Sequence, residues 1–394
     1  MGRPPLRIWF RFGKDITSEP GVIMHVLMTA DTLGGVWNYT RELATGLSKR
    51  GVRLTLVSFG EIPSPEHTQW MEGLSQFDYH PTGFKLEWMR DSMEDLEHSA
   101  EYLQHLIDEV QPDLLHLNQY FYGAMEAAVP KIVVAHSDVV GWWQAVHKTD
   151  PPSSSWIEGY RELVFNGLQA ADVVVAPSRW MLESLTDNYL EPANGRVIYN
   201  GRTPTLFNPH VTKDDIVMSV GRLWDPGKQV SLLAEQELPC ETFLIGSTED
   251  PDGNSQLSFA HAGGDSRVNI NFKTQQSEAQ LRQLYGRCSI YAATSRYEPF
   301  GLAPLEAALS RCALVANDIP SLREIWGDAA LYFQHNDARS LGVAIRSLLA
   351  DADLRRDYAN RALRHAQEHY NAARMTNDYL ALYEATIHSE ALAA

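Results

Sequence analysis

Apolar residues in this chain occur in short runs that alternate with longer amphipathic stretches. The runs are MHVLMTA, RLTLVSF, LLHLN, KIVVAH and DVVVAPS in the first half, and DIVMSVG, ETFLIG, VNINF, SIYAATS and ALVAND in the second. Short runs of this kind, separated by helical segments, are typical of parallel strands whose two faces are covered by helices. The pattern therefore predicts an α/β protein with two Rossmann-like, doubly wound parallel sheets.

The clearest helical segment follows the first run. Apolar residues recur at Val36, Tyr39, Leu43 and Leu47, which is the spacing of one helix face. Two cationic residues and Gly51 come next, as expected at a helix C-terminus. We therefore predict a crossover helix between the first two strands.

The segment NGRTPTLFNPHVTK, residues 200–213, interrupts the alternation with two prolines and an Asn-Gly pair. It predicts a hinge between an N-terminal, acceptor-side domain (24–205) and a C-terminal, donor domain (206–375). We expect residues 1–23 to be an extension outside the fold and residues 376–394 to form a helix that packs back on the N-terminal domain. In such sheets ligands bind beyond the carboxyl ends of the strands, so two facing domains predict an interdomain cleft lined by strand-end residues.

Composition narrows the function classes. The 394 residues exceed one ordinary domain, and the formal net charge of −17 argues against binding to nucleic acid or direct docking on an anionic membrane. No apolar stretch is long enough to span a bilayer, and the first 23 residues lack the apolar core of a signal peptide. The cysteines are three in number, without a C-x-x-C spacing, and are interpreted as buried thiols in a reducing compartment. These features predict a cytoplasmic protein without a zinc site.

Two strand-end loops carry residues suited to an anion. Gly34 and Gly35 open the first helix, where small residues allow backbone N–H groups to approach a ligand; taken alone, the pair favours the alternative of a plain tight turn. Arg222 and Lys228 follow the first strand of the second half in SVGRLWDPGKQ. Two cations on one such loop favour a diphosphate ligand; the alternative is a pair of solvated surface charges.

The stretch SRYEPFGLAPLE, residues 295–306, places Glu298 in a loop and Glu306 inside the helix that follows. The N–H groups around Phe300, Gly301 and Leu302 would point out of the helix start and suit a phosphate. Carboxylates beside an anion site are better matched to sugar hydroxyls, which donate hydrogen bonds to them. The alternative makes Glu298 a solvated loop acid and Glu306 an acid that stabilises the helix dipole.

This Glu-x7-Glu stretch resembles the signature of the retaining glycosyltransferases of sequence family 4, which have the GT-B fold. Four other stretches resemble further family landmarks and occur in the same order. They are the Gly-Gly-Val of the first loop, VGRL with Lys228, VIYNG before the hinge and EAALSRCALVAND. The resemblance covers nearly the whole chain from Met24.

The resemblance implies a role for each matching position. Glu306 would bind the nucleotide ribose and Glu298 the hydroxyls of the donor sugar. The amides near Gly301 and Leu302 would bind the diphosphate, with Arg222 and Lys228 stabilising it as it leaves and the Gly35 turn approaching it from the other domain.

Other positions extend or limit this comparison. His136 in VVAHSD matches a family histidine that touches the transferred sugar, and Asp138, Trp142 and Trp143 beside it are candidates for the acceptor side, although a tryptophan pair on a helix commonly serves packing. Gln229 stands where the family commonly has glycine. The stretch NDIPSLRE lacks the glycine pair that usually precedes the family's Pro-Glu, so we expect a differently shaped sugar pocket.

Asp250 and Asp252 form a D-x-D pair, but Pro, Gly and Asn around them are typical of a turn. We therefore expect no metal and no cofactor beyond the nucleotide sugar. The predicted activity is retaining transfer of a hexose from UDP- or GDP-hexose to a hydroxyl of a saccharide, glycolipid or carrier-linked acceptor. The alternatives are a nucleotide-sugar 2-epimerase of the same fold, which needs no acceptor, and a non-catalytic nucleotide-sugar binding protein; a pyridoxal-dependent phosphorylase is a remoter alternative.

Overall fold

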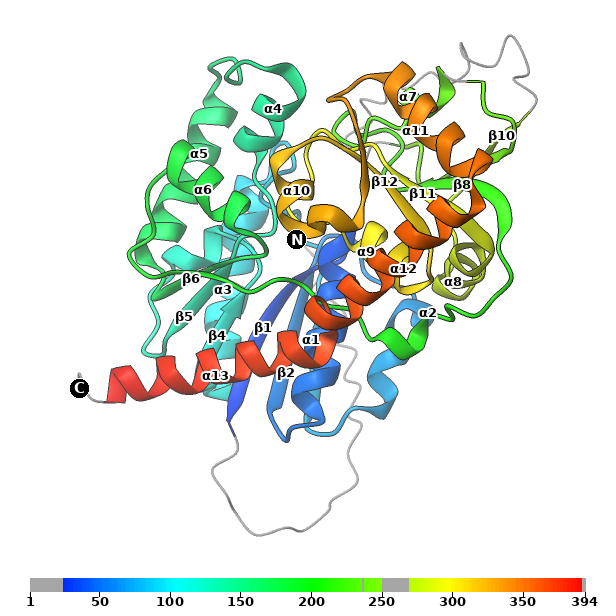
Figure 1. Cartoon of the computed structure of the whole chain (residues 1–394). Helices are drawn as coiled ribbons and strands as arrows, with labels where there is room; N and C mark the ends of the chain where they lie inside the picture. The colour runs from blue at the N-terminus through cyan, green and yellow to red at the C-terminus, as the bar shows by residue number, and fades with distance from the viewer. Residues whose placement is uncertain (1–23, 236, 250–268, 392–394) are drawn as a thin grey trace. The chain divides into compact units, whose positions relative to one another are not determined.

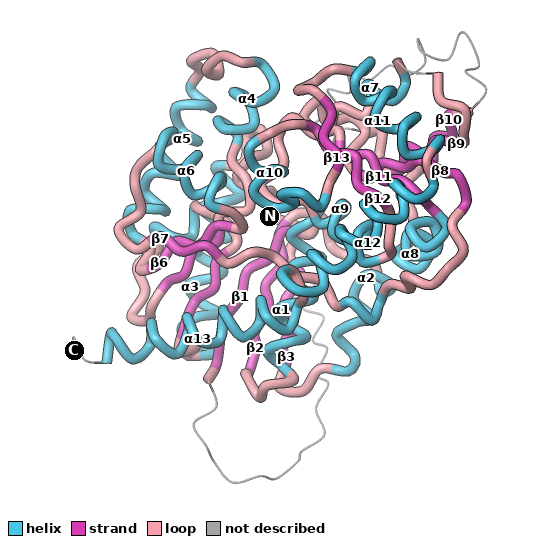
Figure 2. Tube along the Cα trace, viewed as in Figure 1, coloured by secondary structure: helices cyan, strands magenta, loops and turns pink. Residues whose placement is uncertain are grey.

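The computed structural model describes residues 24–235, 237–249 and 269–391, and contains two parallel β-sheets with helices packed on them (Figure 1). The predicted α/β fold class is confirmed. The N-terminal extension and the Asp250–Asp252 turn lie outside the described residues. The strands of both sheets are drawn in magenta in Figure 2.

The first sheet contains the strands predicted in the first half of the chain. Its strand order is β3 (Phe77–Pro81), β2 (Arg53–Phe59), β1 (His25–Asp31), β4 (Leu114–Leu117), β5 (Lys131–Val134), β6 (Val173–Ala176) and β7 (Gly195–Val197). In the centre, Met28 of β1 pairs in parallel with Leu56 of β2 and His116 of β4. The helices of this part are α1 (Gly35–Ser48), α2 (Pro65–Thr68), α3 (Met93–Val110), α4 (Val139–His147), α5 (Ser155–Ala170) and α6 (Arg179–Asn188).

Helix α1 is the crossover helix that the apolar spacing predicts. Tyr39, Leu43 and Leu47 are buried along one face, and the chain leaves the helix through Lys49. Gly51 follows with a φ of 82°, a left-handed backbone that favours glycine.

The second sheet has the order β10 (Ile270–Lys273), β9 (Glu241–Ile245), β8 (Asp214–Val220), β11 (Cys288–Ala293), β12 (Ala313–Asn317) and β13 (Leu331–Phe333). Neighbouring residues of β8, Val217 and Met218, belong to two different apolar clusters, so both faces of the sheet are buried. Helices of this part are α7 (Ser231–Ala234), α8 (Glu278–Arg287), α9 (Leu302–Leu309), α10 (Pro320–Trp326), α11 (Ala338–Ala350) and α12 (Ala352–His369). Helix α12 lies against β12 and α9.

Contacts divide the chain into two compact units. One contains residues up to 134, with 162–174 and those from 379 on; the other contains residues 135–161 and 175–378. The last helix, α13 (Ala372–Ala391), brings Tyr383 to His116 of the first unit, with 2.6 Å between the phenol oxygen and Nδ1. The phenol oxygen of Tyr39 lies 3.2 Å from Nε2 of the same imidazole.

Cys240, Cys288 and Cys312 are free and buried, as the sequence predicts. In the part of the chain that the structure describes, no helix combines the length and apolar character needed to cross a bilayer.

Candidate active site

The second sheet reverses its direction of winding between β8 and β11. These two strands are neighbours in space, although β9 and β10 lie between them in the sequence. Ligands of open parallel sheets bind at such a switch point, beyond the carboxyl ends of the strands. The loops that leave β8 and β11 here carry Arg222, Lys228 and Glu298, so the topology brings the predicted donor-binding residues together.

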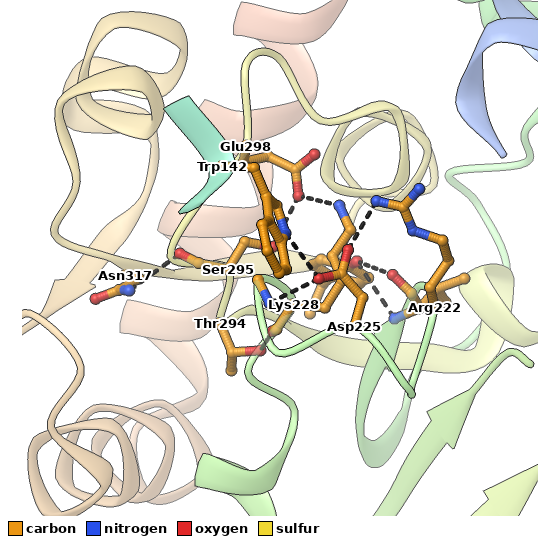
Figure 3. A network of polar contacts seen from close by, with 11 residues as sticks. Trp142, Arg222, Asp225, Lys228, Thr294, Ser295, Glu298 and Asn317 are labelled. Carbon is orange, nitrogen blue, oxygen red and sulfur yellow. Dashed lines mark hydrogen bonds and ion pairs between the residues drawn. The ribbon is translucent and has the colours of Figure 1, made fainter. Parts of the chain in front are cut away.

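Lys228 and Glu298 form an ion pair at this position, with 2.7 Å between Nζ and Oε2 (Figure 3). The hydroxyl of Ser295 donates to the same carboxylate oxygen at 2.8 Å. The side chain of Glu298 is only 13% exposed and that of Lys228 only 21%. Glu298 is therefore not a solvated loop acid, and Lys228 is not a solvated surface charge.

Arg222 is held by Asp225, a residue that no sequence motif indicated as part of the site. The guanidinium Nη2 lies 2.7 Å from Oδ2 of Asp225. The other carboxylate oxygen accepts the N–H of Gly227 at 2.7 Å and the indole N–H of Trp142 at 3.0 Å (Figure 3). Burial opposes the ionisation of Asp225, but the charges of Arg222 and Lys228 and these hydrogen bonds outweigh it, so its pKa lies below the ordinary value.

The backbone of both loops has left-handed positions. Gln229, which stands where the family commonly has glycine, has a φ of 48°, and its buried side-chain oxygen has no hydrogen-bond partner. Gly301, the N-cap of α9, has a φ of 91°, and a Cβ there would lie 3.1 Å from Cγ of Glu298. The glycine thus permits both the turn and the position of Glu298. Phe300, beside it, is buried in the core of the second sheet, and Leu302 is the first residue of α9.

Glu306 lies one turn inside α9 and is 8% exposed. One of its oxygens lies 3.1 Å from Nε of Arg202, a buried residue of the predicted hinge. Nη2 of the same guanidinium lies 3.6 Å from Glu278. Glu306 is thus anchored by a cation rather than acting only on the helix dipole.

His136 follows strand β5 and is half-buried. The surrounding protein desolvates the ring and lowers its pKa to about 3, so the imidazole is neutral at physiological pH. The neighbouring Asp138 is the N-cap of α4 and accepts the N–H of Gly141 at 2.6 Å. Its carboxylate also accepts the phenol hydroxyls of Tyr189 at 3.0 Å and Tyr297 at 3.2 Å.

These contacts bear on the acceptor-side candidates. Asp138 is 3% exposed and its oxygens are occupied by protein donors, so it organises the loop rather than presenting a free carboxylate. Trp142 binds Asp225, and Trp143 packs on His147 with ring centroids 4.1 Å apart. The structure thus shows a hydrogen bond within the protein for Trp142 and ring packing for Trp143, whose buried indole N–H has no hydrogen-bond partner.

Gly34 and Gly35 lie in the first compact unit. Gly34 is the N-cap of α1 with a φ of 81°, and Gly35 is the first helical residue. A side chain at position 34 would meet open space, so the requirement for glycine comes from the backbone conformation alone.

Glu324 is a further residue that sequence reasoning missed. Its carboxylate accepts the N–H groups of Arg179 and Trp180, at the start of α6, at 2.8 and 2.9 Å. It also accepts the hydroxyl of Tyr199 at 3.0 Å. Glu324 is the last residue of NDIPSLRE. Its position four residues after Pro320, on a short helix, was the only feature of this stretch that could have indicated a role for it.

Comparison with known families decides the identity. Residues 33–205 match Glycosyltransferase Family 4, and residues 207–365 match Glycosyl transferases group 1. The chain is a group 1 glycosyltransferase. This glycosyltransferase therefore carries its ion-paired Lys228 and Glu298 in the part that matches the group 1 family.

Curated relatives of this glycosyltransferase are distant. The alpha-maltose-1-phosphate synthase of Mycolicibacterium smegmatis is 25% identical over 68% of this chain and 75% of its own length. The phosphatidyl-myo-inositol mannosyltransferase of the same organism is 24% identical over 52% of this chain and 53% of its own.

Solved structures agree on the fold. The sucrose-phosphate synthase of Thermosynechococcus elongatus has a TM-score of 0.77 at 20% identity, covering 93% of this chain and 100% of its own. The Anabaena protein Alr3699/HepE, in complex with UDP-glucose, has a TM-score of 0.73 at 16% identity, covering 92% of this chain and 100% of its own. The glycosyltransferase therefore has the predicted GT-B fold.

Proposed function

We propose that this glycosyltransferase moves a hexose from a nucleoside-diphosphate hexose to an acceptor hydroxyl, with retention of anomeric configuration and without a metal ion. The observation that carries the proposal is the Lys228–Glu298 pair at the switch point of the second sheet, with Arg222 on the same loop as Lys228. Beyond the carboxyl ends of β8 and β11, the chain thus brings together cations that can bind a diphosphate and a carboxylate that can bind sugar hydroxyls.

The proposed donor site follows from the ion pairs of its two cations. Arg222 and Lys228 are each paired with a carboxylate, and an incoming diphosphate competes for the same N–H groups. Asp225 and Glu298 thus hold the two cations in place before the donor arrives, which reduces the reorganisation needed during the reaction. Glu306, fixed by Arg202, would accept the ribose hydroxyls.

In the proposed reaction the bond between the anomeric carbon and the phosphate oxygen breaks. A new bond forms from the anomeric carbon to the acceptor oxygen on the same face of the sugar. The acceptor's proton passes to the departing phosphate oxygen, and Arg222 and Lys228 stabilise the negative charge on the diphosphate. His136 is neutral at physiological pH and would contact the sugar by hydrogen bonding without adding a charge.

Either UDP or GDP fits this description of the donor. Two relatives are named as a phosphatidyl-myo-inositol mannosyltransferase and an O-antigen chain mannosyltransferase, and the structure of one neighbour is a complex with UDP-glucose. A saccharide, glycolipid or carrier-linked acceptor agrees with the same names.

A thermal-shift panel of UDP, GDP and their hexoses tests the proposal. A ligand at 100 times its Kd should stabilise the protein by about 2.7 kcal/mol. The donor so identified should then release nucleoside diphosphate with an acceptor and in the presence of EDTA, and NMR of the product should show the anomeric configuration of the donor. A product of inverted configuration, or loss of turnover in EDTA, would contradict the mechanism.

The 2-epimerase alternative is separated by incubating the donor alone. An epimerised sugar or a glycal, formed without acceptor, would select it. Donor binding without turnover toward any acceptor would instead select a binding protein.

A further inference from the structure

The first sheet has a switch point of its own. Its strand order places β1 beside β4, and the loops that follow these strands begin at Thr32 and Asn118. By the topological rule applied above to the second sheet, the carboxyl ends of β1 and β4 are where a ligand of the first sheet would bind. None of the sequence motifs discussed above, apart from the Gly34–Gly35 turn, falls here.

Two neighbouring residues in the loop after β4 have buried side-chain amides, and these differ in their hydrogen bonding. Asn118 is tied to β1, because its side-chain N–H donates to the carbonyl of Thr29 at 2.5 Å and its backbone N–H donates to the Thr29 hydroxyl at 2.9 Å. Gln119 is only 3% exposed, and neither its amide oxygen nor its amide nitrogen has a hydrogen-bond partner. Folded proteins rarely leave both ends of a buried amide unmatched, so a bound partner is indicated.

A buried carboxyl group, that of Glu87, lies against the loop that carries Gln119. Glu87 accepts the N–H groups of Tyr120 and Phe121, at 3.1 and 2.9 Å, and so fixes the loop immediately after Gln119. Burial raises the pKa of Glu87 to about 7, and the charge of Asp31 contributes in the same direction. Asp31 ends β1 and accepts the N–H of Leu33 at 2.6 Å.

Asp31, and Glu87 in its ionised form, disfavour a phosphate at this position. Lys85 and Arg90, on the loop that carries Glu87, are exposed, and the ammonium of Lys85 points to the carbonyls of Arg90 and Asp91, each at 3.4 Å. An uncharged ligand rich in hydroxyls is the better match, because an amide offers one acceptor and two donors and each hydroxyl both donates and accepts.

We propose that Gln119 is a specificity-determining residue that hydrogen-bonds the hydroxyls of a neutral sugar acceptor at the switch point of the first sheet. This inference rests on the proposed function, since it names the class of the second substrate. It makes the acceptor a sugar ring that presents no phosphate at this subsite.

The first test compares two neighbouring substitutions by thermal unfolding. Gln119→Leu replaces an unmatched amide by an apolar side chain of similar size, so its Tm should equal or exceed that of the unmodified protein. Asn118→Leu removes the side-chain hydrogen bond to the carbonyl of Thr29, and its Tm should fall by about 2–4 °C or more. A fall for Gln119→Leu as large as that for Asn118→Leu would overturn the proposal, because Gln119 would then be a structural residue.

The second test measures sugar binding by saturation-transfer NMR, with the donor site filled by a saturating nucleoside diphosphate. The probes are the methyl α-glycosides of mannose, glucose and galactose, with glucose 1-phosphate for comparison. At least one glycoside should give a signal that falls fivefold or more in Gln119→Leu, and glucose 1-phosphate should give less. Equal signals in both proteins, no glycoside signal, or a preference for glucose 1-phosphate would overturn the inference.

Binding of the nucleoside diphosphate is read separately, from the Tm of the unmodified protein. If no nucleoside diphosphate raises that Tm, the proposed function itself fails. If one does, while the sugar signals ignore Gln119, only the inference about the acceptor fails.

Discussion

Tyr297 and Asp138 are joined by two hydrogen bonds although 159 positions separate them in the sequence. The phenol oxygen of Tyr297 accepts the N–H of Asp138 at 2.9 Å, and its hydroxyl donates to the carboxylate at 3.2 Å. Tyr297 immediately precedes Glu298, and Asp138 lies two residues after His136. One buried contact therefore sets the positions of both loops that carry the proposed sugar-binding residues.

Replacing Tyr297 by Phe should affect both stability and turnover. The change leaves the N–H and a carboxylate oxygen of Asp138 without this partner, at a cost of about 1–3 kcal/mol in the free energy of unfolding. Loss of the link should also lower kcat by about 10- to 100-fold, because small displacements of reacting groups are costly. Urea unfolding and nucleoside-diphosphate release measure the two effects.

Tyr370→Phe is the matched control for this change. It removes a buried hydrogen bond, 2.8 Å from the hydroxyl to the carbonyl of Ile325, and keeps the ring that packs on Phe300. Its stability should fall by about 1 kcal/mol with kcat retained. If Tyr297→Phe loses stability but keeps full turnover, the link is structural only.

Arg222 should contribute far more to turnover than to stability. Its side chain is 45% exposed, so its ion pair with Asp225 is largely screened by solvent. Removal of a group that stabilises charge in the transition state commonly costs about 10²–10³ in rate. Arg222→Ala should therefore keep its melting temperature and lose kcat to this extent, whereas Arg339→Ala, which removes an exposed arginine at the start of α11, should change neither. Unimpaired turnover in Arg222→Ala would refute the proposed role.

The central strands of the two described sheets were predictable from the sequence, whereas of their edge strands only β10, in the run VNINF, was predicted. Strand β12, ALVAN, is buried throughout, and such an apolar run has one physical explanation in an α/β chain. Strands β3, β7 and β13 were missed. β3 is FDYHP, half-polar and ending in proline, and β7 is the three-residue GRV; both have a neighbour on one side only. Edge strands need no continuous apolar run, because only part of their surface is buried.

The site residues that were predictable are those whose role is indicated by residue type and by position within one short segment. Glu298, Lys228 and Arg222 are recognisable in the sequence because they follow strand ends. Cations there suit the diphosphate of a nucleotide sugar, and an acid suits its sugar hydroxyls. Their partners do not stand out, because Asp225 lies in an ordinary-looking turn and Arg202 in the hinge. Long-range pairing, such as the 3.1 Å contact of Arg202 with Glu306, depends on tertiary structure that no short motif encodes.

The neutral state of His136 predicts a pH dependence of stability. Its pKa in the folded protein, about 3, lies below the ordinary value of 6.5. The unfolded chain therefore binds a proton first, so the contribution to stability is complete above pH 6.5 and is lost as the pH falls toward 3. Between pH 7 and pH 5 the loss should reach about 2 kcal/mol, at about 1.4 kcal/mol per pH unit.

His136→Gln isolates this contribution, because the other titrating groups are shared with the unmodified protein. Urea unfolding of both proteins at pH 7 and pH 5 should show a smaller fall for the variant. Identical falls would mean that His136 titrates normally in the folded protein.

Gln229 should be destabilising where it stands. A left-handed backbone costs a residue with a side chain about 1–2 kcal/mol, and the buried oxygen of Gln229 without a partner adds to that cost. Glycine removes both costs and in return adds flexibility to the unfolded chain, about 0.5–1 kcal/mol. Gln229→Gly should therefore be more stable by about 1 kcal/mol, measured by thermal unfolding. Gly301→Ala should change in the opposite direction, because its φ of 91° is equally left-handed and the new Cβ would press on Glu298. A loss of stability in Gln229→Gly would show that packing of the glutamine stem outweighs the strain of its backbone.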